Sequence, residues 1–133
     1  MEYNFMWSTP TSGAPIVSFA SYGITFNSSV IEILNRPEKI MVGFDAKNKV
    51  VGIKPTDSSN IKGFPFAERE RNGYVRIGNK DFIKYISAKL QIDFQKAVRF
   101  VAEWDEENKI LIVDLSKPME GAENTEEEYF ENE

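Results

Sequence analysis

Two similar hairpin patterns constrain the fold of this chain more than any other feature of its sequence. Residues 44–49 and 104–109 each contain an aromatic residue, Asp, two further residues, Asn and Lys, and apolar runs lie on both sides of each segment. Asp and Asn favour tight turns because their side chains hydrogen-bond to the nearby backbone, and Asn tolerates a left-handed conformation. The pattern predicts two β-hairpins with Asn48 and Asn108 in left-handed positions.

The segments that precede the hairpins are also similar, which indicates an internal duplication. Matching residues lie 52 positions apart before the hairpins and 60 positions apart within them, so the second copy has eight extra residues, around Ser87 to Phe94. The matched pairs are Tyr22 with Tyr74, Asn27 with Asn79, Ile31 with Ile83, Asp45 with Asp105, Asn48 with Asn108, and Lys49 with Lys109. Each copy is expected to follow the order strand, strand, short helix, strand, strand, with a strand over Phe64 to Arg71 opening the second.

The size of one copy predicts that both share a single core. A unit of about 45 residues buries too little apolar surface to be stable alone, and closing a sheet into a barrel removes its open edges. We therefore expect a mainly β protein with short helices (α+β) in which two repeats form a pseudo-two-fold β-barrel. The expected parts are an N-terminal arm over 1–14, one duplicated domain over 15–118, with repeats at 15–55 and 63–115, and an acidic, disordered tail over 119–133.

The composition excludes several classes of function. The chain has neither Cys nor His, so it lacks thiolates, the usual general base and the usual transition-metal ligand. No glycine-rich phosphate loop or nucleophile elbow is present. We expect no enzyme activity, no cofactor and no metal. The absence of a long apolar run, of a secretory signal and of cysteines predicts no membrane association and a cytoplasmic location.

The carboxylates at the tip of the second hairpin are the one candidate for acid–base chemistry. Asp105, Glu106 and Glu107 are adjacent, but a hairpin tip is exposed, so no pKa shift is expected there. Their spacing is also too short for a calcium loop. We interpret these residues as turn chemistry.

The charge is distributed unevenly. Residues 119–133 hold seven acidic residues and no base, which leaves 16 basic against 14 acidic residues in the rest of the chain. Five basic residues of the second copy are candidates for phosphate contact, because arginine and lysine bind phosphate oxygens readily: Arg69, Arg71, Arg76, Lys80 and Lys84. The alternative is a solvated face of mixed charge with cross-strand ion pairs, since Glu68, Glu70 and Asp81 are interleaved with them.

Residues 72–78, Asn-Gly-Tyr-Val-Arg-Ile-Gly, together with the helix expected from Lys80, resemble the AbrB-type swapped-hairpin DNA-binding domain. Members carry Gly, Arg, two apolar residues, Ile and Pro before a short helix and a hairpin. Residues 21–27 are a weaker copy, and the tandem arrangement is similar to that of the MraZ branch. Gly78 and Asn27 replace the family's Pro, and Tyr74 and Ile24 replace its Arg. The resemblance covers about residues 15–115; double-psi barrels are the alternative topology.

The resemblance implies a regulator or accessory protein, with DNA as a candidate ligand. A protein-interaction module with no nucleic-acid role is the second hypothesis, because relatives of the antitoxin type bind a toxin through acidic tails. Its contacts would come from the N-terminal arm, which carries Tyr3, Phe5, Met6 and Trp7, or from Tyr129 and Phe130 in the tail. The tail could instead be a solubilising end, or fold back on the body and compete with nucleic acid. A small-ligand-binding barrel is the third hypothesis, and both monomer and homodimer stay open.

Overall fold

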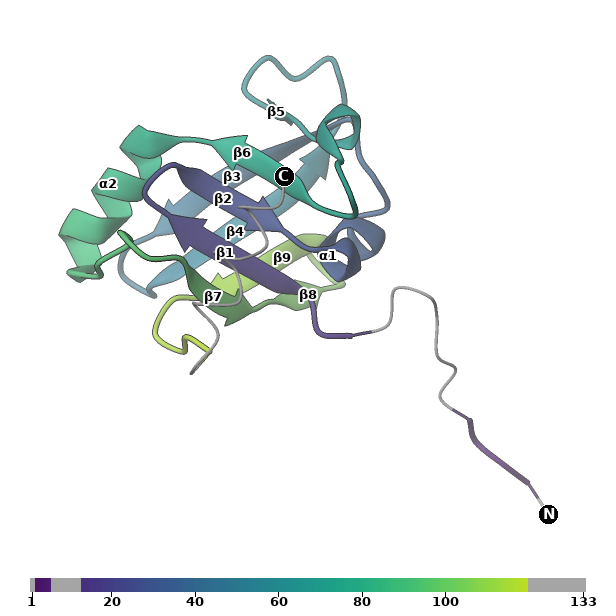
Figure 1. The fold of residues 1–133 in the computed structure, drawn as a ribbon. Coiled ribbons are helices and arrows are strands. Elements are labelled where there is room, and N and C mark those ends of the chain that lie inside the picture. Colours follow the sequence, from purple (N-terminus) through teal and green to yellow (C-terminus); the bar gives the residue numbers. More distant parts are fainter. Residues whose placement is uncertain (1, 6–12, 120–133) are drawn as a thin grey trace.

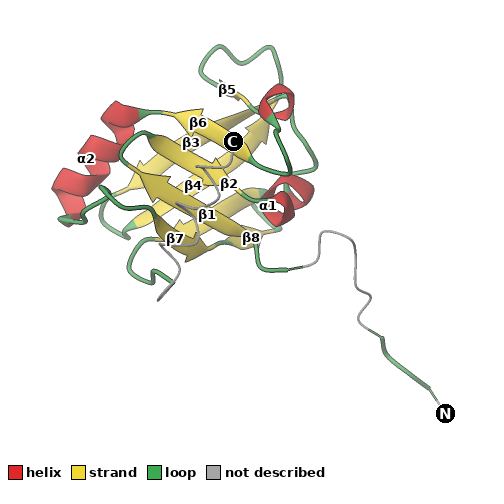
Figure 2. Cartoon of the chain, in the orientation of Figure 1, coloured by secondary structure: helices red, strands yellow, loops and turns green. Residues whose placement is uncertain are grey.

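The computed structural model describes residues 2–5 and 13–119, and these are mainly β-structure with a few short helices (Figure 2). The tail beyond Met119 and most of the N-terminal arm lie outside the described residues, so the prediction of a disordered tail falls there. The α+β class expected from the sequence is confirmed for the described residues. Among them, no helix has both the length and the apolar character needed to span a bilayer.

The strands form two antiparallel sheets that lie one behind the other in Figure 1. The first sheet has the order β6-β2-β1-β7, from β1 (Ile16–Ala20), β2 (Gly23–Phe26), β6 (Val75–Gly78) and β7 (Val98–Val101). The second has the order β5-β3-β4-β9-β8, from β3 (Lys39–Asp45), β4 (Val50–Thr56), β5 (Phe64–Pro65), β8 (Glu103–Asp105) and β9 (Ile110–Asp114). The helices α1 (Ser28–Ile33) and α2 (Lys80–Leu90) lie at opposite ends of the sheets, and η1 (Ala67–Arg69) is a 3₁₀ turn.

The core lies between the two sheets because alternate residues of the strands are apolar. Phe19 of β1 meets Phe100 of β7 edge to face, with ring centroids 5.5 Å apart. Phe26 of β2 meets Phe66 at the same separation of 5.5 Å. The second sheet contributes Ile40, Val51, Ile53, Leu111 and Val113, all buried. Buried residues from both expected repeats therefore form one cluster.

One segment joins the two sheets directly. β7 pairs with β1 in the first sheet, and β8, only one residue further along, pairs with β9 in the second. The residue between them is Ala102, whose side chain is buried and whose N–H donates to the carbonyl oxygen of Pro15 at 2.9 Å. The described strands therefore form two joined sheets, and no closed barrel is detected among them.

The registers of two ladders have the symmetry expected of a duplicated chain. In the pairing of β2 with β6, Gly23 lies opposite Gly78 and Phe26 lies opposite Val75. A shift of 52 residues takes Gly23 to Val75 and Phe26 to Gly78, so it converts one pair into the other. In the pairing of β4 with β9, Val51 lies opposite Val113 and Ile53 opposite Leu111, and a shift of 60 residues converts one pair into the other in the same way. Within each ladder, equivalent residues of the two copies are thus paired by a local two-fold relation.

The prediction of a strand over Phe64 to Arg71 is wrong for most of its length. β5 covers only Phe64–Pro65, and residues 67–69 form the η1 turn. The cause is Phe66, whose side chain is buried against Phe26. The backbone N–H groups of Phe66 and Ala67 donate to the carbonyl oxygens of Glu38 and Pro37, so the chain leaves the path of a strand at this point.

Both predicted hairpins form, but the left-handed residue is one position later than expected. Lys49 and Lys109 have φ of 58° and 57°, whereas Asn48 and Asn108 are not left-handed. The Asn48 N–H donates to Asp45 Oδ1 at 3.1 Å and its side chain donates to Oδ2 at 2.7 Å, and the second hairpin repeats this arrangement. The Asn residues therefore hold the Asp carboxylates, and the chain reverses at the following Lys.

Candidate functional site

The five basic residues predicted to contact phosphate lie along three consecutive elements, and we call them the basic segment. Arg69 ends η1, Arg71 follows it, Arg76 lies in β6, and Lys80 and Lys84 lie in the first half of α2. All five residues are exposed. Lys80 and Lys84 are four residues apart and therefore project from one side of the helix.

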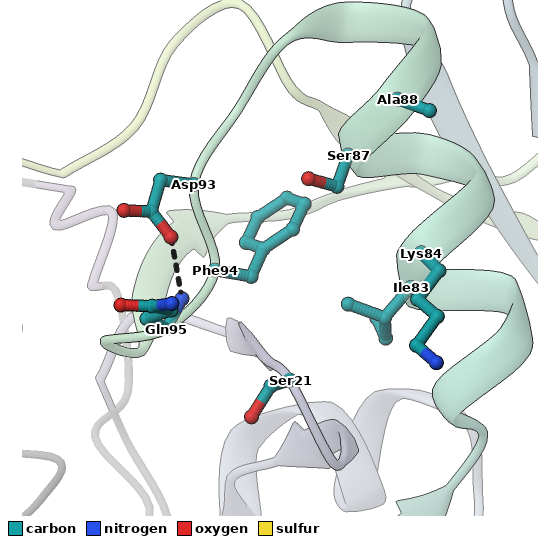
Figure 3. Close-up of a pocket in the computed structure, with 8 residues that line it drawn as sticks. All are labelled: Ser21, Ile83, Lys84, Ser87, Ala88, Asp93, Phe94 and Gln95. Atoms are coloured by element: carbon teal, nitrogen blue, oxygen red, sulfur yellow. Dashed lines mark hydrogen bonds between the residues drawn. The ribbon is translucent and has the colours of Figure 1, made fainter.

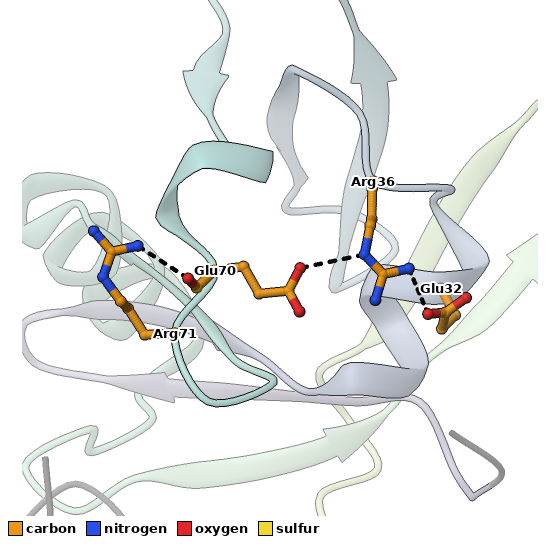
Figure 4. A network of polar contacts seen from close by, with 4 residues as sticks. All are labelled: Glu32, Arg36, Glu70 and Arg71. Atoms are coloured by element: carbon orange, nitrogen blue, oxygen red, sulfur yellow. Dashed lines mark hydrogen bonds and ion pairs between the residues drawn. The ribbon is translucent and has the colours of Figure 1, made fainter. Parts of the chain in front are cut away.

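One acidic side chain within the basic segment, that of Glu70, pairs with a residue outside the segment. Glu70 accepts a hydrogen bond at 3.3 Å from Nε of Arg36, which belongs to the first repeat, and the same guanidinium pairs with Glu32 (Figure 4). The hydrogen bond to Glu32, followed by the nearby charges, raises the pKa of Arg36. Arg71 instead donates to the main-chain carbonyl oxygens of Glu68 and Glu70, at 3.1 and 2.9 Å. The cross-strand pairing expected for a mixed-charge face is thus replaced, at Glu70, by an ion pair with the first repeat.

Arg76 is held in place by an aromatic ring. Its guanidinium carbon lies 5.3 Å from the centroid of the Tyr22 ring, a distance typical of a cation–π contact. Arg76 pairs with Thr25 in the ladder between β6 and β2, opposite to the face that carries the core. This orients its positive charge on the outer face of the first sheet.

A groove of about 410 Å³ lies beside the basic segment and shares Lys84 with it (Figure 3). Its volume falls in the range of roughly 300–1,000 Å³ that is typical of small-ligand sites, although it is open to solvent. It is formed by α2, the turn between β1 and β2, and the segment that follows α2. The lining residues are Ser21, Ile83, Lys84, Ser87, Ala88, Asp93, Phe94 and Gln95.

The wall of the groove is built by residues that the first repeat lacks. α2 ends at Leu90 and is capped by Gln91, which has a left-handed φ of 56°. The Ser87 hydroxyl donates to the carbonyl oxygen of Ile92 at 2.6 Å. Asp93 Oδ1 accepts the N–H of Gln95 at 2.9 Å, and Phe94 is buried with its ring 5.9 Å from that of Phe19. The eight extra residues of the second copy therefore form one wall of the groove.

The groove offers a cation and polar groups but no catalytic arrangement. Lys84 could bind an anionic group, while the Ser87 hydroxyl already donates to the backbone. Among the described residues, no group of three acidic residues, histidines or cysteines is placed to hold a metal ion. This groove is not predicted by the sequence, in which its only signal is the difference in length between the two copies.

The carboxylates with shifted pKa values lie at turns, away from the groove. The prediction of ordinary pKa values at the tip of the second hairpin is wrong, because hydrogen bonds from the Asn108 side chain and backbone lower the pKa of Asp105. The hydrogen bond from Lys109 and that from Trp104 lower the pKa of Glu106. Asp45, Asp57 and Asp114 also have lowered pKa values because of hydrogen bonds from the residues after them. Turn formation explains all of these shifts.

The aromatic candidates for protein contact are described only in part. Tyr3 and Phe5 are 70% and 61% exposed, and their rings stack with centroids 5.5 Å apart. Tyr129 and Phe130 lie outside the described residues.

Comparisons with protein-family models, with curated proteins and with solved structures gave no match to this chain.

Proposed function

We propose that this chain is a non-enzymatic DNA-binding protein of the AbrB-like swapped-hairpin class, a regulator or an accessory to one. One observation carries the proposal: the basic segment presents five exposed cations on consecutive elements, and the intervening Glu70 is engaged by Arg36. Phosphate contacts of this kind position a protein on the duplex without reading its sequence.

The exchange of strands between the repeats supports the swapped-hairpin class. β7 of the second repeat pairs with β1 of the first, and β5 of the second pairs with β3 of the first. Each repeat therefore completes the sheet of the other, as expected when two hairpin units interleave. The class name itself comes from the resemblance of residues 72–78 and 21–27.

The test is a titration of the full chain with mixed-sequence duplex DNA at several salt concentrations, in which binding is measured by fluorescence anisotropy. If all five cations meet phosphates, log K should fall against log salt with a slope of about −4 to −5. Lys80→Gln and Lys84→Gln should each reduce the slope by about one. The matched control is Lys54→Gln, which removes an exposed lysine from β4 in the other sheet and should leave the slope unchanged.

Binding could be masked by the acidic tail, so the titration is repeated on a variant in which the seven tail glutamates are replaced by Gln. Absence of salt-dependent binding at low ionic strength in both proteins would refute the DNA proposal. Equal slopes for Lys54→Gln and Lys80→Gln would refute the assignment of the interface.

The stacked, exposed Tyr3 and Phe5 favour a second candidate, a protein-interaction module in which the N-terminal arm is the contact. A partner retained by the immobilised parent chain should be lost by the double variant Tyr3→Ser with Phe5→Ser. Ile61→Ser is the control, because Ile61 is 92% exposed in a distant part of the sequence. Equal retention by all three proteins would exclude the arm.

A further inference from the structure

The outer face of the first sheet carries a row of four polar residues with an arginine at each end. Core residues such as Phe19 and Ile24 point inward, so their neighbours along each strand point to the opposite face. The registers align Arg76, Thr25, Ser18 and Arg99 across β6, β2, β1 and β7. We call these four residues the arginine row.

The neighbouring row is nearly without side chains. It consists of Gly78, Gly23 and Ala20, which pair across β6, β2 and β1. Another segment of chain could therefore lie close to the backbone of this face, beside the arginine row.

The middle of the arginine row is buried although it faces away from the core. Ser18 and Thr25 are 3% and 2% exposed. The helices of the described chain lie at the ends of this sheet, and neither crosses its outer face (Figure 1). The Thr25 hydroxyl is buried and has no hydrogen-bond partner among the described residues. A buried hydroxyl is unfavourable unless it is hydrogen-bonded, so these residues indicate a polar segment above them.

The path of the chain identifies which segment can reach this face. The N–H of Met119, the last described residue, donates to the carbonyl oxygen of Arg99 at 2.8 Å, so the chain leaves the described region at β7, the edge of the first sheet. The sequence continues over residues 120–133. Fourteen extended residues span roughly 46 Å, whereas the distance from β7 to β6 is about 14 Å, three strand spacings.

The charges of the face and of the segment are complementary. Residues 120–133 contain seven glutamates and no basic residue. The arginine row has a guanidinium at each end, and the one of Arg76 lies over the Tyr22 ring. Arginine and carboxylate form strong paired hydrogen bonds because both groups are planar and charged.

We propose that the outer face of the first sheet binds residues 120–133 of the same chain, with tail glutamates paired to Arg76 and Arg99. The tail lies over Ser18 and Thr25 and along the row of small residues. This interaction does not require the proposed DNA-binding function. If that function holds, the docked tail occupies Arg76 and competes with the phosphate backbone.

The test uses a single thiol, which is possible because the chain has no cysteine. Ser18→Cys replaces a hydroxyl by a thiol in the middle of the covered row, and its rate of alkylation by iodoacetamide is measured on the full chain. The rate should be low at low salt. It should rise at least tenfold when the seven tail glutamates are replaced by Gln, and also when Arg76→Gln and Arg99→Gln are combined.

The matched control is Gly43→Cys, because a Cβ at Gly43 has no atom within 4 Å. This thiol on the second sheet should react rapidly and at the same rate in every background. Thr25→Cys gives the same readout from the next strand if Ser18→Cys does not fold, as judged by circular dichroism.

Three outcomes would overturn the proposal. Slow alkylation of Ser18→Cys in both tail backgrounds would mean that something other than the tail covers the face, and fast alkylation in both would mean that nothing covers it. Protection that grows with protein concentration would assign the occupant to a second copy. DNA affinity of the same proteins separates the two proposals. If replacement of the tail glutamates speeds alkylation of the thiol but none of the proteins binds DNA, the DNA function alone is refuted.

Discussion

Gly23 is the residue whose replacement the backbone tolerates least. Its φ is 154°, and a Cβ there would lie 2.0 Å from the carbonyl oxygen of Ile77 in the neighbouring strand. Gly23→Ala should therefore lower the free energy of unfolding by at least about 3 kcal/mol, because it combines backbone strain with a clash against main chain. Urea denaturation measures the change.

Gly43→Ala is the matched control for this prediction. Gly43 lies within β3, and a Cβ there would meet no atom within 4 Å. Because alanine has less conformational freedom in the unfolded chain, this variant should be unchanged or more stable by about 0.5–1 kcal/mol. Equal losses for the two variants would show that the close approach of β2 to β6 is not the cause.

Asp45 and Asp105 make the stability of the hairpins depend on pH. Hydrogen bonds from Asn48 and Asn108 hold both pKa values below the ordinary 3.8 in the folded chain. A lowered folded pKa stabilises the protein above the unfolded pKa, and this contribution is lost as the pH falls through the folded pKa. Asn48→Ala should raise the pKa of Asp45, and Asn108→Ala should raise that of Asp105. The free energy of unfolding should then fall less steeply as the pH drops below about 4.

Carbon-13 NMR titration of the Asp carboxyl groups checks this directly. Asp57 serves as the internal control, because hydrogen bonds from Ser59 lower its pKa and neither variant changes that contact. Unshifted titration of Asp45 and Asp105 in the variants would contradict the assignment of the cause.

At the scale of elements, the two helices begin at equivalent residues with different capping. Asn27 Oδ1 accepts the N–H of Val30 at 3.2 Å and that of Ile16 at 3.1 Å, whereas Asn79 makes no side-chain cap hydrogen bond. Asn27→Ala should therefore cost about 2 kcal/mol of unfolding free energy. The equivalent change Asn79→Ala should cost less than about 0.5 kcal/mol.

Thermal or urea unfolding of the two variants compares one cap with the other in the same protein. Similar losses would mean that the hydrogen bonds of Asn27 do not determine where α1 begins. A larger loss for Asn79→Ala would reverse the assignment.

The elements coded by local signals are the ones that the sequence predicts. The hairpins follow from Asp and Asn at fixed offsets, and a short helix between the strands is expected in each copy. The expected strand over Phe64 to Arg71 fails because burial of Phe66 against Phe26 decides the path of the chain. That contact joins residues 40 positions apart, so no local pattern could reveal it.

In the candidate site, too, the sequence predicts what is close together in the chain and does not predict what strand pairing brings together. The basic segment is visible in the sequence because its residues are close together in the chain. The groove needs Ser21 beside Lys84 and Asp93, and the arginine row needs Arg76 beside Thr25 and Arg99 beside Ser18. These neighbours come from strand pairing between the repeats, which the sequence predicts only in outline.

At the scale of the whole molecule, the exchange of strands predicts one cooperative unfolding transition. Trp104 in β8 reports on the second sheet, and Trp7→Phe leaves it as the only tryptophan of the chain. Its fluorescence and the far-ultraviolet circular dichroism should give the same urea midpoint, because both sheets enclose one core. Two separate midpoints would show that the sheets unfold independently.

The short β5 makes the two repeats unequal. The second repeat supplies a strand of two residues where the first supplies the five residues of β1, which lies in the interior of the first sheet. Two copies of the second repeat would thus lack an interior strand of the first sheet. The two repeats are therefore complementary and cannot replace each other. Fragments separated within the loop over 57–62 should reassemble with each other and not with themselves.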